Sequence, residues 1–78
     1  AHLLLGRIHL RSGRVREAID ALKISLWSQE TPQAHVTLAE AYLQGKDAAA
    51  ARAEAERALA LDPASEDARR LLERIDRR

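Results

Sequence analysis

The chain of 78 residues has no cysteine, methionine or phenylalanine, and only three glycines, two prolines, one tryptophan and one tyrosine. Without cysteine it can form neither a disulfide framework nor a thiolate metal site. Its longest strongly apolar run, Leu3–Leu5, is far shorter than the about 20 apolar residues of a membrane-spanning helix, and no signal-peptide pattern is present. We expect a soluble chain without a membrane partner, and both a cytoplasmic and a periplasmic location are compatible with this.

Neither sign of charge is in large excess. Lys and Arg number 13 and Asp and Glu 12, so the formal net charge is +1, and both signs are interspersed. This pattern is typical of a solvated surface. It is not typical of a basic surface that attracts a polyanion. Nucleic-acid-binding proteins more often have a basic excess and several stacking aromatics, whereas this chain has Trp27 and Tyr42 alone. We therefore expect no nucleic-acid partner.

The residues that are abundant favour α-helix. Alanine, leucine, arginine and glutamate dominate, and all four have high helix propensity. Glycines and prolines divide the chain into short segments with apolar residues at three- and four-residue steps. We predict an all-α fold of five helices and no strand, at about residues 2–12, 14–28, 32–44 and 47–61 and after Ser65. Short loops between them imply antiparallel neighbours.

Residues that favour helix ends stand at these boundaries. Gly13 suits the left-handed position just past a helix end, and Gly45 is expected to end the third helix. Thr31 followed by Pro32 is an N-cap followed by proline at the first helical position. Ser65 is best explained as the N-cap of the fifth helix.

The sequence resembles itself at a shift of 33 residues. The aligned pairs include His2 with His35, Leu5 with Leu38, Gly6 with Ala39, His9 with Tyr42, Ala18 with Ala51, and Leu26 with Leu59. A helix-turn-helix unit that repeats at about this length is the signature of a helical solenoid.

At these positions the chain resembles the tetratricopeptide repeat family, whose pattern is W-x2-L-G-x2-Y, then A-x3-F and P, over about 34 residues. One stretch matches as His35-x2-Leu38-Ala39-x2-Tyr42, then Ala51-x3-Ala55-x2-Ala58, and closes with Leu61-Asp62-Pro63. The preceding stretch matches at Leu5, Gly6, Gly13, Ala18 and Leu22. The resemblance implies an α-solenoid of antiparallel helix pairs, with units at about 1–31 and 32–64 and a terminal or capping helix at about 65–78.

The chain opens directly inside an apolar periodic pattern, so we expect it to be a segment of a longer protein. Abundant alanine and arginine favour a bacterial source.

The repeat also predicts which residues pack together. Small residues are expected where helices approach closely, at Gly6, Ala18, Ala39 and Ala51. Leu5, Leu38 and Leu72 are expected to fill the layer between them. Trp27 is expected to occupy the core place that Leu61 fills in the next unit.

Candidate catalytic chemistry is sparse. His2, His9 and His35 lack the usual metal-ligand spacings, and the equivalence of His2 and His35 in the repeat explains them as packing residues. Neither a nucleophile motif nor a Gly-rich phosphate loop occurs in the sequence. We therefore predict no enzyme, no catalytic or metal-binding residue and no cofactor. Carboxylates near arginines, as in Arg52 with Glu56 and Glu54 with Arg57, are expected to form ion pairs on helix surfaces.

The resemblance further implies that the first helix of each pair lines a concave groove in which peptides or helices dock. By matching positions, the candidate groove residues are Leu3, Arg7, Leu10, Arg11, Val36, Glu40, Leu43, Gln44, Arg70 and Arg74. An arginine can hold a carboxylate through two N–H groups. We therefore expect a scaffold that binds a protein or peptide partner with apolar anchors and acidic flanks.

Two other functions remain open. Leu3, Leu4 and Ile8 make the first helix apolar on more than one face, so the chain could form a homodimer through this helix or serve as a spacer. RNA binding through a related helical-hairpin repeat is a third hypothesis. The Leu-Asp-Pro closure and the near-zero net charge argue against it.

Overall fold

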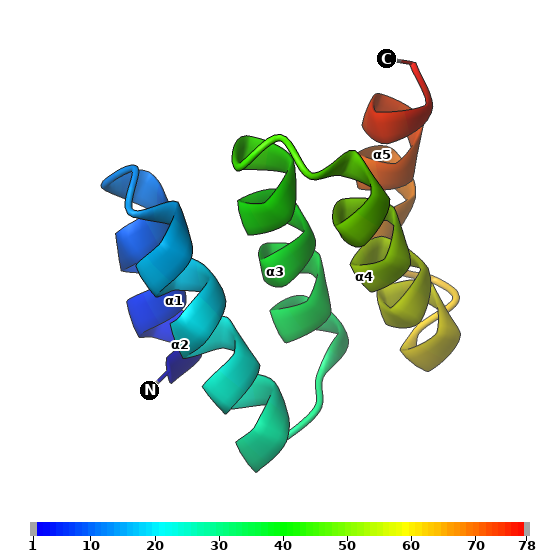
Figure 1. Cartoon of the computed structure of the whole chain (residues 1–78). Coiled ribbons are helices and arrows are strands. Elements are labelled where there is room, and N and C mark those ends of the chain that lie inside the picture. Colours follow the sequence, from blue (N-terminus) through cyan, green and yellow to red (C-terminus); the bar gives the residue numbers. More distant parts are fainter. Residues whose placement is uncertain (1, 78) are drawn as a thin grey trace.

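The computed structural model describes residues 2–77, which form five α-helices (Figure 1). The helices are α1 (His2–Arg11), α2 (Val15–Ser28), α3 (Pro32–Gln44), α4 (Ala48–Leu61) and α5 (Glu66–Asp76), and no strand occurs among the described residues. The predicted all-α class and the five predicted helices are confirmed. Ala1 and Arg78, which the outer predicted segments include, lie outside the described residues. Within 2–77 no helix is both long enough and apolar enough to cross a membrane.

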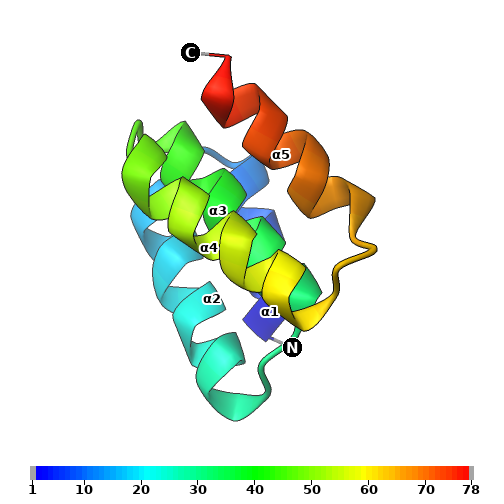
Figure 2. The same cartoon turned by 90° about the vertical axis from the view of Figure 1, so that its right-hand side faces the viewer.

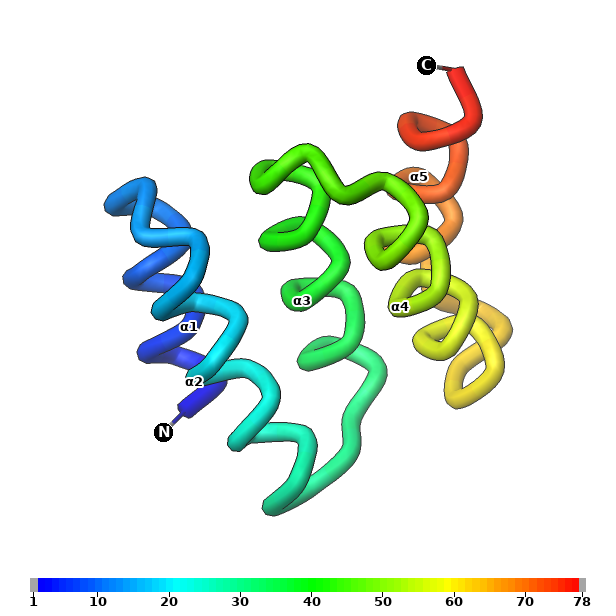
Figure 3. Tube along the Cα trace, in the orientation of Figure 1, coloured from blue at the N-terminus to red at the C-terminus, as the bar shows by residue number. Residues whose placement is uncertain are grey.

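The helices form two antiparallel pairs and one further helix, stacked in chain order. The first helix pair is α1 with α2, and the second is α3 with α4 (Figures 1 and 2). Helix α3 packs against α2 as well as α4, and α5 packs against both α3 and α4. The Cα trace in Figure 3 shows that α1, α3 and α5 each run in the same direction. These three helices therefore occupy equivalent places in the stack.

Predicted caps define two of the helix starts. The Thr31 hydroxyl accepts a hydrogen bond from the Ala34 N–H at 3.1 Å, and Pro32 stands in the first turn of α3. The Ser65 hydroxyl accepts one from the Ala68 N–H at 3.2 Å. Each bond satisfies a backbone donor that the helix itself leaves unpaired.

Two turns place a residue in the left-handed region. Gly13 has φ +78, as predicted for the residue past α1. After α3 the left-handed residue is Lys46, with φ 67, whereas Gly45 has φ −80. A Cβ on Gly45 would lie 3.2 Å from Cγ1 of Val15. The absent side chain at Gly45 therefore allows a close approach to the start of α2.

Small residues dominate the core, and they let the helices approach closely. The cluster that joins the two helix pairs contains Ala18, Leu22, Leu38 and Ala41. The cluster between α3, α4 and α5 contains Val36, Ala39, Leu43, Ala51, Ala55, Ala58, Ala68, Leu71 and Ile75. A Cβ on Gly6 would lie 2.6 Å from Cγ of Leu22, so the predicted need for a small residue at this contact is confirmed.

Two large side chains expected in the core are exposed. Leu5 is 42% exposed, whereas Leu38, its equivalent in the repeat, is 2% exposed in the cluster that joins the helix pairs. Leu38 is covered because α3 packs on the first helix pair, and no described helix covers α1 in the same way. Leu61, at the end of α4, is 41% exposed. The core predictions for Leu5 and Leu61 are therefore wrong.

Trp27 is also exposed. Its side chain is 91% accessible to solvent. Trp27 follows the buried Leu22 by five residues, which rotates it well away from the buried stripe of α2. The prediction that Trp27 fills a core position is wrong.

Candidate functional site

An open groove of about 850 Å³ lies over the three equivalent helices. The wall on α1 consists of Leu4, Arg7, Ile8, Leu10 and Arg11. The floor on α3 consists of Pro32, Gln33, Val36, Thr37 and Glu40. The opposite wall consists of Asp62, Ser65, Glu66 and Asp67, at the turn into α5. A second hollow of about 250 Å³ shares Leu10 and Glu40 and adds Leu43, Gln44 and Arg74.

Helical spacing brings the α1 wall together. Leu4, Arg7, Ile8 and Arg11 stand at positions i, i+3, i+4 and i+7, which lie on one face of a helix. Leu4 is 64% and Ile8 51% exposed, so they offer apolar surface beside the two arginines. The predicted groove residues did not include this leucine and isoleucine. Their four-residue spacing beside Arg7 and Arg11 was the signal that could have identified them.

Most of the predicted groove residues line one of the two hollows. They are Arg7, Leu10, Arg11, Val36, Glu40, Leu43, Gln44 and Arg74. Leu3 lies elsewhere, because it packs against the cluster that contains Ala18 and Leu22. Arg70 is exposed outside the lining residues, with its Nη2 3.5 Å from Oε2 of Glu66. Val36 and Leu43 are buried and offer a partner little surface.

The two walls of the groove differ in charge. Arg7 and Arg11 are exposed on the α1 wall, whereas Asp62, Glu66 and Asp67 form the opposite wall. Because Ser65 caps α5, both Glu66 and Asp67 fall in its first turn, where the helix dipole stabilises negative charge. The groove therefore combines a cationic wall with an anionic wall, which the predicted set of arginines did not indicate.

Comparison with known protein families extends the description of this stack of helix pairs. Residues 3–66 match the family described as Tetratricopeptide repeat. The chain belongs to the tetratricopeptide repeat family. Comparisons with curated proteins and with solved structures give no match. Tetratricopeptide repeats generally mediate protein–protein interaction and are typically non-catalytic interaction modules.

Glu40 occupies a central position in the groove of this tetratricopeptide repeat chain, since it borders both hollows. Although much of its surface is open to solvent, partial burial raises the pKa of the Glu40 carboxyl. Arg74 opposes this rise in pKa, Asp67 adds to it, and Arg7 opposes it. Within residues 2–77 no hydrogen bond or ion pair joins the Glu40 carboxylate to another side chain.

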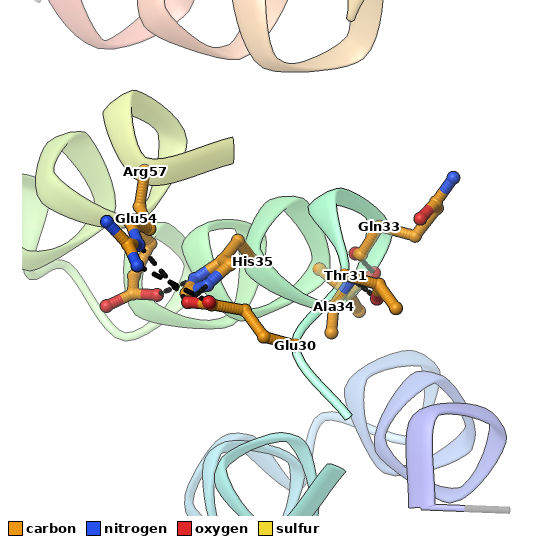
Figure 4. A network of polar contacts seen from close by, with 8 residues as sticks. Glu30, Thr31, Gln33, Ala34, His35, Glu54 and Arg57 are labelled. Carbon is orange, nitrogen blue, oxygen red and sulfur yellow. Dashed lines mark hydrogen bonds and ion pairs between the residues drawn. The ribbon is translucent and has the colours of Figure 1, made fainter. Parts of the chain in front are cut away.

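Apart from the groove, a cluster of polar side chains lies between the α2–α3 loop and α4 (Figure 4). His35 is buried, and its Nδ1 lies 2.7 Å from Oε1 of Glu54 while its Nε2 lies 2.8 Å from Oε2 of Glu30. Arg57 donates to both Glu30 oxygens, from Nε at 3.1 Å and from Nη2 at 3.3 Å. The hydrogen bond from Arg57, and next that from His35, lower the pKa of Glu30.

Two predictions are corrected here. His35 is buried, as expected for a packing residue, although both its ring nitrogens contact carboxylates, whereas its repeat equivalent His2 is exposed, so the packing prediction is wrong for His2. Arg57 pairs with Glu30 rather than with Glu54.

The other expected ion pair differs in the same way. Arg52 pairs with Asp76 on α5 rather than with Glu56, so Arg52 and Arg57 both form ion pairs between different elements instead of between neighbouring turns of α4. Among residues 2–77 no group of three or more His, Asp or Glu side chains is arranged to hold a metal ion.

Proposed function

We propose that this chain is an interaction module that binds a peptide or a helix of another protein in the groove over α1, α3 and α5. The observation that supports the proposal is the exposed apolar pair Leu4 and Ile8, which lies beside Arg7 and Arg11 on one wall of the groove.

The α1 wall defines one half of the expected partner. Apolar side chains of the partner would cover Leu4 and Ile8, and removal of apolar surface from water contributes about 25 cal/mol per Å². Carboxylates of the partner would accept hydrogen bonds from Arg7 and Arg11, whose guanidinium groups suit two-pronged contacts. The partner therefore has apolar anchors with acidic residues beside them.

Affinity capture with matched variants tests this function. The full chain is immobilised beside Arg7→Glu/Arg11→Glu/Arg74→Glu, which reverses three groove cations. The control is Arg14→Glu/Arg16→Glu/Lys23→Glu, which makes the same change in charge at exposed positions that line neither hollow. We expect the original chain and the control to retain a protein that the groove variant loses. Titration calorimetry with the purified protein then measures both affinities, and equal affinity for the groove variant would contradict the proposal.

Self-association is a second candidate, favoured by exposed apolar residues at the outer side of the first helix pair. Leu5 and Ile24 are both exposed. Their repeat equivalents in the second pair, Leu38 and Arg57, contact the preceding elements, through the cluster with Leu22 and through Glu30 respectively. The same positions on α1 and α2 therefore face outward, where a second copy could cover them.

Sedimentation velocity over a wide concentration range tests this second candidate. We expect a concentration-dependent dimer that Leu5→Glu/Ile24→Glu converts to a monomer, because charge would be buried unpaired in the interface. A monomer at every concentration of the original chain would exclude self-association.

A further inference from the structure

The floor of the groove carries a single charge. Glu40 borders both hollows, and the other lining residues of α3 are uncharged: Pro32, Gln33, Val36, Thr37, Leu43 and Gln44. A segment that crosses α3 where the two hollows meet therefore passes this carboxylate.

Two of the other groove carboxylates have contacts that Glu40 lacks, whereas Asp67, like Glu40, has no hydrogen bond or ion pair from its carboxylate within residues 2–77. Glu66 pairs with Arg70 at 3.5 Å, and the Asp62 carboxylate accepts a hydrogen bond from the Ala64 N–H at 3.1 Å. Arg7 and Arg74 act on Glu40 electrostatically, but no N–O contact of 4.0 Å or less joins either arginine to it in the described chain. Partial burial also raises the pKa of the Glu40 carboxyl, because burial disfavours its charged form. A positively charged side chain of the partner would supply the ion-pair contact that Glu40 does not have within residues 2–77.

The charges around Glu40 are of both signs, since Arg74 and Arg7 oppose the rise in its pKa and Asp67 adds to it. Asp67 and Glu66 lie on the wall next to the floor, on the side away from Arg7 and Arg11. A basic side chain placed between Glu40 and the α5 wall would have Asp67 and Glu66 as further carboxylates beside it, and would leave Arg7 and Arg11 on the α1 wall to the acidic part of the partner. Charge-assisted pairs of this kind are the stronger hydrogen bonds in proteins, especially when water is excluded.

We infer that the groove recognises segments that carry a lysine or arginine in addition to the apolar and acidic residues, and that this basic side chain pairs with the Glu40 carboxylate. The inference rests on the proposed function, because it names the partner chemistry of the same groove. It adds a basic anchor to the acidic and apolar features that the α1 wall selects.

Selection from a library of random displayed peptides tests the inference on the full chain. We expect the selected peptides to be enriched in lysine or arginine beside apolar and acidic residues. A synthetic peptide from this set should bind Glu40→Gln about tenfold more weakly or worse, as loss of a hydrogen bond to a charged group implies. Glu17→Gln is the control, since Glu17 is an exposed carboxylate of α2 that lines neither hollow.

Charge reversal makes the test specific to the pair. Glu40→Lys should abolish binding of the original peptide, and replacement of the basic peptide residue by glutamate should restore it. Circular dichroism and thermal melting of each variant check that it is folded, which we expect because Glu40 lies on the open floor.

The outcomes separate the inference from the proposed function. If peptides bind the groove, as shown by loss of binding to Arg7→Glu/Arg11→Glu/Arg74→Glu, but bind Glu40→Gln as tightly as the original chain, the basic anchor is wrong and groove binding stands. If no peptide is selected, or if binding survives both the arginine and the Glu40 variants, the proposed function fails and the inference fails with it.

Discussion

At the residue scale, the contacts of His35 replace those of the aromatic residue that the repeat pattern has at this position. Its two ring nitrogens face Glu54 and Glu30, at 2.7 and 2.8 Å. A carboxylate only accepts hydrogen bonds, so a ring with both N–H groups satisfies both contacts, whereas a neutral ring satisfies one. The sequence could not predict this arrangement, because Glu30 and Glu54 lie five and nineteen residues from His35 along the chain, outside the three- and four-residue spacing of helical neighbours.

Glu30→Gln should lower the thermal stability more at neutral pH than in acid. Hydrogen bonds from Arg57 and then His35 lower the pKa of Glu30 below its ordinary value of 4.5. A lowered pKa in the folded state contributes stability above pH 4.5 that is lost as the pH falls through the folded value. Melting curves followed by circular dichroism at pH 7 and pH 3 should therefore show a lower melting temperature for the variant at pH 7 and a smaller difference at pH 3. An equal difference at both pH values would rule out this linkage.

Glu40→Gln should have the opposite effect. Burial raises the pKa of the Glu40 carboxyl in the folded chain, with Arg74 opposing the rise. The folded chain therefore binds the proton of this carboxyl more tightly than the unfolded chain does. The charged carboxylate therefore costs stability, and that cost develops as the pH rises from 4.5 through the folded pKa. The variant should melt at a higher temperature than the original chain at pH 7 and lose this advantage near pH 3. A lower melting temperature for the variant at pH 7 would show that Glu40 stabilises the fold.

At the element scale, the sequence predicted most where the determinants are local. Helix number, the caps at Thr31 and Ser65, and the left-handed Gly13 could be predicted because each depends on neighbouring residues. Burial of Leu5 and Trp27 was predicted wrongly, because it depends on which helix covers each face. The α1 wall of the groove follows from helical spacing, whereas the acidic wall depends on how the α4–α5 turn returns toward α3. No local pattern encodes that return.

Gly6→Ala should destabilise the contact between α1 and α2. The new Cβ would lie 2.6 Å from Cγ and 2.7 Å from Cδ2 of Leu22. Such overpacking costs about 1–3 kcal/mol, and the higher helix propensity of alanine offsets about 1 kcal/mol. Urea denaturation should show a net loss of about 1 kcal/mol, a first estimate built from those two terms.

A double-mutant cycle identifies the cause of that loss. Leu22→Ala alone should cost about 2–5 kcal/mol, because Leu22 is fully buried. In the double variant the smaller side chain at position 22 leaves room for the new methyl group, so the total loss should be smaller than the sum of the single losses. Strictly additive losses would show that the Gly6 contact with Leu22 is not the cause.

At the scale of the whole molecule, the stack is held by interfaces between successive elements. Leu38 joins the first and second helix pairs, and the Arg52–Asp76 ion pair joins α4 to α5. Stability in such a stack is approximately a sum of repeat and nearest-neighbour terms. When one interface is weakened, the parts of the molecule on its two sides should therefore differ in their free energy of unfolding.

Leu38→Ala tests this view. The side chain is 2% exposed, so its truncation should cost about 2–5 kcal/mol. Hydrogen exchange should show that amides of α1 and α2 lose more protection than those of α4 and α5, because the variant weakens the interface between the two helix pairs. Equal loss of protection throughout would show that the stack unfolds as one unit.

The exposed position of Trp27 has a consequence for spectroscopy. It is the only tryptophan of the chain, and its indole already contacts water in the folded state. Indole in water emits at longer wavelength than indole in apolar surroundings, so unfolding should shift the fluorescence of this chain very little. A shift to shorter wavelength would instead report that another molecule has covered the end of α2. The fluorescence of Trp27 should therefore report association at the end of α2, while it changes very little on unfolding.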